Sequence, residues 1–262
     1  MGLFTPKIAP EIQICEYVEY LEDLPVFKSC NMSLAQMFPA EKYDHCVKIE
    51  MEIYMKDIEN GLLSDAELSH INTIETMLSE HIDGVYAGRG LVCSKGYVYL
   101  LYYISKRNAQ KASSIFSALL NSAFRHTETD VVYDPRGKHY FDLLYPNEFQ
   151  MKTIEVQNIL KKLKRYGDDG ELPRDVNFML SFPNKEAVLA FASEAFKNDF
   201  AYVDMIKEPV AERVLPQFKL ILKTNMPFKA DLINEKIKYL MDLSEKFAGS
   251  FKGVETNIVS YK

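Results

Sequence analysis

The sequence predicts an α+β protein made of two units with the element order β-α-β-β-α-β, each an antiparallel sheet with helices packed on one face. One observation is the strict alternation of apolar and polar residues over 46–56, which is typical of a strand with one buried face. Another is the helical spacing of apolar residues over 185–198 and 229–248, between segments with strand character. Residues 46–133 and 175–259 both follow this order, which is called ferredoxin-like.

The composition is that of an ordinary globular protein. The chain has 262 residues, of which 47% are hydrophobic and 26% are charged, and this length suits one large domain or two smaller ones. Residues 1–148 carry 13 basic and 21 acidic side chains, whereas residues 149–262 carry 18 and 16. The whole chain has a net charge of -6 and lacks a basic footprint, so we expect no direct binding of nucleic acid.

The first half is expected to begin with extra strands and then to follow the βαββαβ order. Ser64 and Glu67 match a capping box, which marks the start of its first helix. The expected elements are a hairpin at 12–32 around a turn at Leu24-Pro25, a strand at 46–56, a turn at Asn60-Gly61, a helix from 64 to 83, strands at 85–93 and 97–104, a helix from about 108, and a strand at 129–133.

The second half is expected to repeat the same order after a leading helix. Asn184 is placed to cap one helix and Gly249 to end another. The expected elements are a helix at 148–166, a linker loop at 167–170, a strand at 175–182, a helix at 185–198, strands at 200–207 and 217–224, a helix at 229–248, and a strand at 251–259.

Four cysteines and the first residues of the chain bear on its compartment. We expect Cys15, Cys30, Cys46 and Cys93 to be reduced and mostly buried, because a chain of this size does not need disulfides for stability. The N-terminus matches neither a signal peptide nor a myristoylation site, and no apolar stretch approaches 18 residues. The sequence therefore predicts a cytoplasmic protein that does not span a membrane.

Motifs for cofactors, metals and nucleophiles are missing from the sequence. His45 lies beside Cys46, but neighbouring residues on a strand point to opposite faces and do not share an ion. The glycine-rich stretch from Gly84 to Gly90 lacks the Lys-Ser/Thr of a phosphate loop, and no G-x-S-x-G motif occurs. We therefore expect no catalytic residue, no metal and no cofactor.

Tyrosines crowd the strand at 97–104. Tyr97, Tyr99 and Tyr103 are expected to share a face with Leu101, and ferredoxin-like sheets that bind RNA stack bases on such aromatics. The strand carries no basic residue, and the acidic first half repels phosphate. Packing between the two sheets, or a protein interface, is the preferred interpretation of this face.

Polar residues that are candidates for a ligand or partner contact gather after the strand at 129–133. They are Asp134, Arg136, His139 and Tyr140, and Arg174 opens the strand that follows the expected linker. Such loop residues serve function in many proteins. The preferred interpretation is that Asp134-Pro135 starts a turn and its neighbours stabilise the domain junction, while Arg174 forms an ion pair that holds the linker; a contact with a ligand or partner is the alternative.

Short motifs in the middle of the chain resemble a known pair of families. The chain resembles proteins that join domain of unknown function 695 to a C-terminal domain similar to the regulator of ribonuclease E activity B. The motifs are Tyr133-Asp134-Pro135-Arg136-Gly137-Lys138-His139-Tyr140, Leu144-Tyr145-Pro146-Asn147-Glu148, Tyr166-Gly167-Asp168, Pro173-Arg174-Asp175-Val176 and Ser181-Phe182-Pro183.

The resemblance implies a domain at residues 8–146 and a ferredoxin-like domain at residues 147–262. It also implies that the second domain acts as a protein ligand, because its namesake family binds a ribonuclease and inhibits it. For the first domain the resemblance implies no established activity.

Three hypotheses for function follow. The leading one is a non-enzymatic regulatory protein that binds another protein, with a ribonuclease E-type enzyme as the specific partner. The alternative is an enzyme or small-ligand sensor with a site between the domains, which would use Asp134, Arg136, His139 and Arg174. The third is an RNA-binding module.

Overall fold

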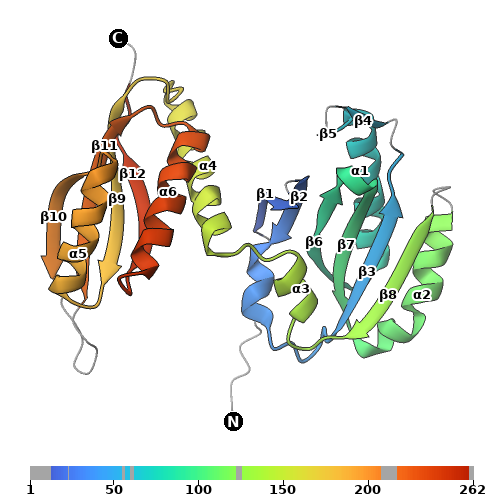
Figure 1. Ribbon diagram of the computed structural model, residues 1–262. Coiled ribbons are helices and arrows are strands. Elements are labelled where there is room, and N and C mark those ends of the chain that lie inside the picture. Colours follow the sequence, from blue (N-terminus) through green and yellow to red (C-terminus); the bar gives the residue numbers. More distant parts are fainter. Residues whose placement is uncertain are drawn as a thin grey trace. The chain divides into compact units, whose positions relative to one another are not determined.

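The computed structural model describes residues 13–22, 24–54, 57–59, 62–121, 126–207 and 217–259 (Figure 1). The chain divides into two compact units, Met1–Pro146 and Asn147–Lys262. The N-terminal segment that we compared with targeting signals and the expected turn at Asn60-Gly61 lie outside the described residues.

Unit 1 contains a six-stranded antiparallel sheet in the order β1-β2-β6-β7-β3-β8, with helices α1 and α2 in the βαββαβ connections. Its strands β6-β7-β3-β8 have the order of a ferredoxin-like sheet, and β1 and β2 extend the sheet beside β6. The elements are β1 (Ile14–Leu21), β2 (Leu24–Asn31), β3 (His45–Glu52), α1 (Asp65–His81), β6 (Gly84–Val92), β7 (Tyr97–Ile104), α2 (Lys106–Asn121) and β8 (Thr127–Tyr133).

Shorter elements complete unit 1. A two-stranded ribbon of β4 (Ile58–Glu59) and β5 (Leu62–Leu63) precedes α1. A 3-10 helix at Met32–Met37 follows β2, a second at Cys93–Lys95 joins β6 to β7, and α3 (Lys138–Leu143) follows β8. Neither α3 nor the first 3-10 helix was predicted, because each is too short to show a helical period.

One face of the unit 1 sheet packs against α1 and α2. Val47, Ile49, Met51 and Ile53 are almost fully buried in this core, which confirms the predicted apolar face of β3. The strand ends at Glu52, four residues earlier than predicted, but Ile53 remains in the core and its N–H donates to the carbonyl of Gly96 (2.7 Å).

The opposite face of this sheet is covered by the chain's own residues. Tyr103 is fully buried and its hydroxyl donates to Asp134, while the hydroxyl of Tyr99 donates to the carbonyl of Leu143 (3.0 Å). The expectation that these tyrosines pack against a second sheet or a partner was wrong. The segment after β8 returns across this face instead of leaving it open, so the tyrosines are not available to stack RNA bases.

The first hairpin differs from the prediction in the position of its turn. Leu21 pairs with Leu24 and Tyr20 with Pro25, so Leu24 and Pro25 lie in β2. Glu22, in the turn itself, has a positive φ of 51°. Strand β2 pairs with β6 only from Phe27 onward. Pro25 is tolerated in the strand because no neighbour on that side requires its missing N–H.

Unit 2 repeats the ferredoxin-like order and confirms the predicted fold class in the second half. Its antiparallel sheet has the order β10-β11-β9-β12, and the helix of residues 185–198 is divided into α5 and a short 3-10 helix at Phe196–Asn198. The elements are α4 (Glu148–Arg165), β9 (Arg174–Phe182), α5 (Lys185–Ala195), β10 (Ala201–Lys207), β11 (Phe218–Met226), α6 (Ala230–Glu245) and β12 (Ser250–Thr256).

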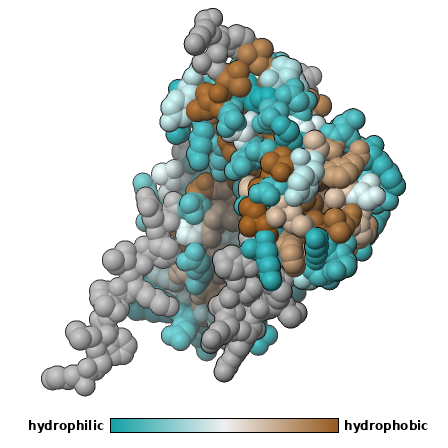
Figure 2. All heavy atoms as spheres, turned by 90° about the vertical axis from the view of Figure 1, so that its left-hand side faces the viewer, coloured by the Kyte–Doolittle hydropathy of each residue, from teal (hydrophilic) through white to brown (hydrophobic). Residues whose placement is uncertain are grey.

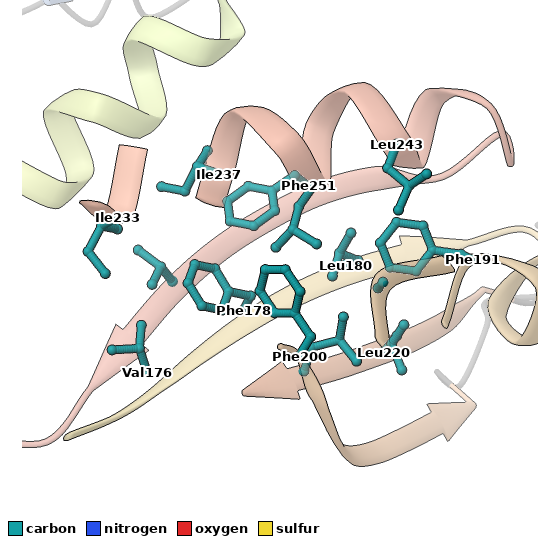
Figure 3. Packing of buried hydrophobic residues seen from close by; sticks show 14 of the residues in the cluster. Val176, Phe178, Leu180, Phe191, Phe200, Leu220, Ile233, Ile237, Leu243 and Phe251 are labelled. Carbon is teal, nitrogen blue, oxygen red and sulfur yellow. The ribbon is translucent and has the colours of Figure 1, made fainter. Parts of the chain in front are cut away.

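The core of unit 2 lies between its sheet and helices. Figure 3 shows Ile233 and Ile237 of α6 above Phe178 and its neighbours on the strands. Helix α4 packs against α6 and β12, and its Val156 and Leu163 belong to the same core. Asn147 caps α4, because its side chain accepts from the N–H of Gln150 (2.8 Å). Helix α4 is therefore an integral part of unit 2.

Candidate functional site

The first candidate site is built around the carboxylate of Asp134, which follows β8. Oδ1 accepts from the backbone N–H of Lys138 (2.7 Å), and Oδ2 accepts from the backbone N–H of His139 (2.9 Å). Oδ2 also accepts from the Tyr103 hydroxyl (2.7 Å) and lies 3.0 Å from Nδ1 of His139. Gly137, in a left-handed conformation with a φ of 71°, turns the chain so that α3 begins against this carboxylate.

The hydrogen bonds determine the charge of Asp134. Burial opposes ionisation of its carboxyl group, but the donors from the His139 backbone, the Tyr103 hydroxyl, the Lys138 backbone and the His139 ring outweigh it. Together they lower the pKa of Asp134 below its ordinary value. Burial beside this carboxylate raises the pKa of Tyr103, which keeps its hydroxyl protonated as a donor.

Cys46 lies at the same site. Its thiol, together with Asp134 and His139, forms a group whose potential ligand atoms all lie within 4.8 Å of one another. Burial is the main reason that the pKa of Cys46 rises to about 12. A thiol with this pKa is protonated at neutral pH and is a poor nucleophile, so the Cys-His-Asp arrangement does not resemble an activated thiol enzyme.

The other two candidate residues of this loop, Tyr140 and Arg136, have different environments. Tyr140 is fully buried, and its hydroxyl donates to the carbonyl of Asn31 (3.0 Å). Arg136 is exposed and is not among the donors to the Asp134 carboxylate. The structure thus brings Asp134, His139 and Tyr140 together and leaves the side chain of Arg136 at the surface.

Sequence reasoning did not connect Cys46 with this loop. Cys46 and Asp134 are 88 residues apart in the chain. The sequence analysis considered His45 as the residue that could share an ion with Cys46, but Nδ1 of His45 lies 2.7 Å from Oδ1 of Asp44. The alternation of the strand could have indicated this contact, because it places Cys46 on the polar face, away from the helices. In the structure Cys46 pairs in register with Tyr103.

Arg174 belongs to a buried ion pair in unit 2. Its guanidinium bonds both oxygens of Asp168, with 2.7 Å from Nη2 to Oδ1, and Asp168 also accepts from the backbone N–H groups of Gly170 (3.0 Å) and Val259 (2.7 Å). The guanidinium of Arg174 is the main reason that the pKa of Asp168 is lowered. The expected linker at 167–170 is therefore wrong, because this loop is held inside unit 2.

A second candidate site is an apolar groove at the surface of unit 2, which we name the α4–β12 groove. It has a volume of about 320 Å³ and lies between the C-terminal half of α4 and the edge strand β12. It is lined by Ile159, Lys162, Leu163, Tyr166, Val254, Glu255, Thr256 and Ile258. The last two turns of α4, which contribute Lys162 to the groove, also carry exposed basic side chains at Lys161, Lys164 and Arg165. The groove therefore suits an apolar segment with acidic neighbours.

Other apolar side chains are exposed on α5 and β10. They include Leu189, which is 58% exposed, and Tyr202, which is 52% exposed. Figure 2 views the molecule from the side on which α5 and β10 lie in Figure 1, and it shows hydrophobic side chains among hydrophilic ones at this surface.

Among the helices that the structure describes, none is both long enough and apolar enough to cross a bilayer.

Comparison with curated proteins and with solved structures gives only distant similarity. No curated protein matches it. A crystal structure of an unknown protein from Galdieria sulphuraria is 15% identical, covers 83% of this chain and 100% of its own, and has a TM-score of 0.26. A structure named "putative glycine cleavage system transcriptional repressor" is 11% identical, covers 81% and 98%, and has a TM-score of 0.24.

The family comparison is more specific. Residues 16–145 match the family of unknown function DUF695, and residues 153–256 match Regulator of ribonuclease activity B. The order of the two matches is the order that the sequence motifs suggested. Each match falls within one of the two units, so unit 1 is similar to the DUF695 family and unit 2 is similar to Regulator of ribonuclease activity B.

Proposed function

We propose that this protein is a non-enzymatic regulator that binds a ribonuclease E-type enzyme through residues 147–262 and lowers its activity. The observation that carries the proposal is the match of residues 153–256 to Regulator of ribonuclease activity B. The domain boundaries that we propose are residues 8–146 and 147–262. Residues 8–146 form the DUF695 part, to which the proposal assigns no catalytic role.

The surface of unit 2 supports binding of a protein. Tyr166 and Ile258 of the α4–β12 groove are 69% and 50% exposed, and exposed apolar side chains with polar surroundings are typical of interaction sites. The basic end of α4 favours a partner segment that carries acidic residues beside apolar ones. We therefore propose the α4–β12 groove as the contact.

The cytoplasm is the compartment we propose for this contact. All four cysteines are free thiols, and Cys30, Cys46 and Cys93 are buried, which agrees with the predicted reduced state and suits a reducing compartment. The protein acts on RNA cleavage through the enzyme, and the proposal requires no direct contact between this chain and RNA.

The test is direct binding of the full chain to a purified ribonuclease E-type enzyme, with RNA cleavage measured in parallel. We expect a complex and slower cleavage. The double variant Tyr166→Ala/Ile258→Ala should bind at least tenfold more weakly, which corresponds to about 1.4 kcal/mol.

The matched control is Tyr202→Ala/Leu189→Ala, which removes one tyrosine and one aliphatic side chain of similar exposure from unit 2 outside the groove. It should bind as the unchanged chain does. Loss of binding in the control alone would move the contact to β10 and α5. A full chain that neither binds the enzyme nor slows cleavage would refute the regulator proposal.

A further inference from the structure

Three side chains of the kinds that bind transition metals meet in unit 1, at a site that the regulator proposal does not use. They are Cys46 of β3, Asp134 at the end of β8 and His139 of α3, and one potential ligand atom from each lies within 4.8 Å of the others. Asp134 and His139 lie five residues apart in one segment, and the fold brings Cys46 to them from a strand 88 residues earlier.

We propose that Cys46, Asp134 and His139 form a site for a divalent transition metal, with zinc as the preferred ion. Zinc combines thiolate, imidazole and carboxylate ligands in one tetrahedral site, whereas magnesium and calcium select oxygen ligands. Three protein ligands leave a fourth position for water or a substrate atom, as in zinc sites that are not purely structural.

Two of the three potential ligand atoms already lie near the spacing that one ion requires. Nδ1 of His139 lies 3.0 Å from Oδ2 of Asp134, and two atoms bound to one zinc at about 2.0–2.1 Å in a tetrahedral site are about 3.3 Å apart. The ion takes the place of the proton on Nδ1 of His139, and the neutral ring carries its proton on Nε2 instead, whereas the proton of the Cys46 thiol is released. Metal binding therefore releases a proton.

The surroundings orient the ligands and leave a route for the ion. The N–H of Lys138 and the hydroxyl of Tyr103 hold the Asp134 carboxylate in place, as outer partners commonly do for metal-binding carboxylates. Cys46 and Asp134 are buried, but the side chain of His139 is 36% exposed. An ion can thus enter on the His139 side, and the sheet encloses it on the Cys46 side.

Cobalt chloride is the probe for this site, because tetrahedral cobalt bound to a thiolate absorbs in the near ultraviolet. Titration of the full, metal-free chain should give this absorption with one equivalent of cobalt, and added zinc should abolish it. The variant Cys46→Ser should lose the near-ultraviolet absorption. The variant His139→Ala, which changes a partly exposed side chain, should bind cobalt at least tenfold more weakly.

The matched control is Cys15→Ser, which removes the partly exposed cysteine outside the group and should keep the absorption of the unchanged chain. Circular dichroism of each variant checks that it is folded. If the full chain gives no thiolate absorption, or if the absorption survives in folded Cys46→Ser, the proposed site is wrong. Equal affinity in the unchanged chain and folded His139→Ala identifies the binding as adventitious and also overturns it.

Discussion

At the scale of single residues, Asp134 joins β7, β8 and α3 of unit 1. Its two oxygens accept from Tyr103 of β7 and from the backbone N–H groups of Lys138 and His139 in α3. Hydrogen bonds to a charged acceptor contribute about 1.5–3 kcal/mol each, and a buried donor left without an acceptor costs about 1–3 kcal/mol. A single side chain thus decides whether the segment after β8 closes over the sheet.

We expect Asp134→Asn to lower the free energy of unfolding of unit 1 by about 3 kcal/mol, because the amide nitrogen turns a hydrogen-bond donor toward other donors. Urea unfolding followed by circular dichroism measures this loss. The control is Asp130→Asn, an exposed acidic residue on β8, which should change stability by less than about 0.5 kcal/mol. Equal stability of the two variants would show that the Asp134 bonds are not structural.

Asp168 gives unit 2 a stability that depends on pH. Its folded-state pKa is lowered, chiefly by Arg174, relative to about 3.9 in an unfolded chain. The folded protein therefore binds fewer protons at this group than the unfolded one does. The stabilising contribution of Asp168 is therefore fully present above about pH 5 and is lost as the pH falls through 3.9 toward the folded-state pKa.

We expect the free energy of unfolding of unit 2 to fall between pH 5 and pH 2, and to fall less in Asp168→Asn. At pH 7 this variant should be less stable by about 3–5 kcal/mol, because it leaves the buried guanidinium of Arg174 without a charged partner. Urea unfolding at a series of pH values measures both effects. Asp169→Asn, a change at the exposed neighbour, should keep the original pH dependence, and the proposal about Asp168 fails if both variants behave alike.

At the scale of elements, the hairpin of β1 and β2 holds two thiols opposite each other. Cys15 and Cys30 are register partners on neighbouring antiparallel strands, where Cα atoms are about 4.5–5.5 Å apart, and disulfides span about 4.4–6.8 Å. The neighbouring Cys30 side chain lowers the pKa of the Cys15 thiol, which favours the Cys15 thiolate as the group that is oxidised first.

We expect one equivalent of hydrogen peroxide to join Cys15 to Cys30. The peroxide takes one hydrogen atom from each thiol and leaves as two molecules of water, so the chain loses two hydrogen atoms. Peptide mapping without reductant, with mass measurement, detects the link. Cys46 and Cys93, which are buried elsewhere, serve as internal controls and should remain thiols. A link between any other pair, or none under conditions that oxidise exposed thiols, would contradict this expectation.

Elements with a strong period could be predicted from the sequence, and the irregular ones could not. The alternation in β3 and the helical stripe of α6, with Ile233, Ile237 and Leu240 buried, come from single faces that each element buries by itself. Helix α3 is six residues long, too short for a period, and its place over β7 depends on bonds to Asp134. The same reason explains why the tyrosines of β7 were assigned to the wrong neighbour.

At the scale of the whole molecule, the candidate metal group depends on a contact between distant parts of the chain, which the sequence alone does not predict. Cys46 meets His139 across 93 positions, and no local motif encodes that distance. The loop motif did identify Asp134, His139 and Tyr140 as a group, because they follow one another in the chain. Arg174 was considered as a further candidate because it is polar and opens a strand. It lies in unit 2, however, and its guanidinium donates to Asp168.

The division of the chain into two units leads to a prediction about where it can be cut. Each unit contains its own core of buried side chains, so residues 147–262 alone should unfold cooperatively, with a melting temperature close to that of the same unit in the full chain. Thermal unfolding followed by circular dichroism tests this. A fragment that starts at residue 171, directly after the loop at 167–170 that the sequence analysis interpreted as a linker, should not fold.

The physical reason is the contribution of α4 to the unit 2 core. The shorter fragment loses the buried side chains of Val156 and Leu163, each of which stabilises the fold by roughly 1.5–3 kcal/mol. It also loses Asp168, which leaves the buried Arg174 unpaired at a cost of about 3–5 kcal/mol. These losses approach the roughly 5–15 kcal/mol by which whole domains are stable. If the shorter fragment melted at the same temperature as residues 147–262, α4 would not contribute to the stability of unit 2. The α4–β12 groove would then not be part of the stably folded unit.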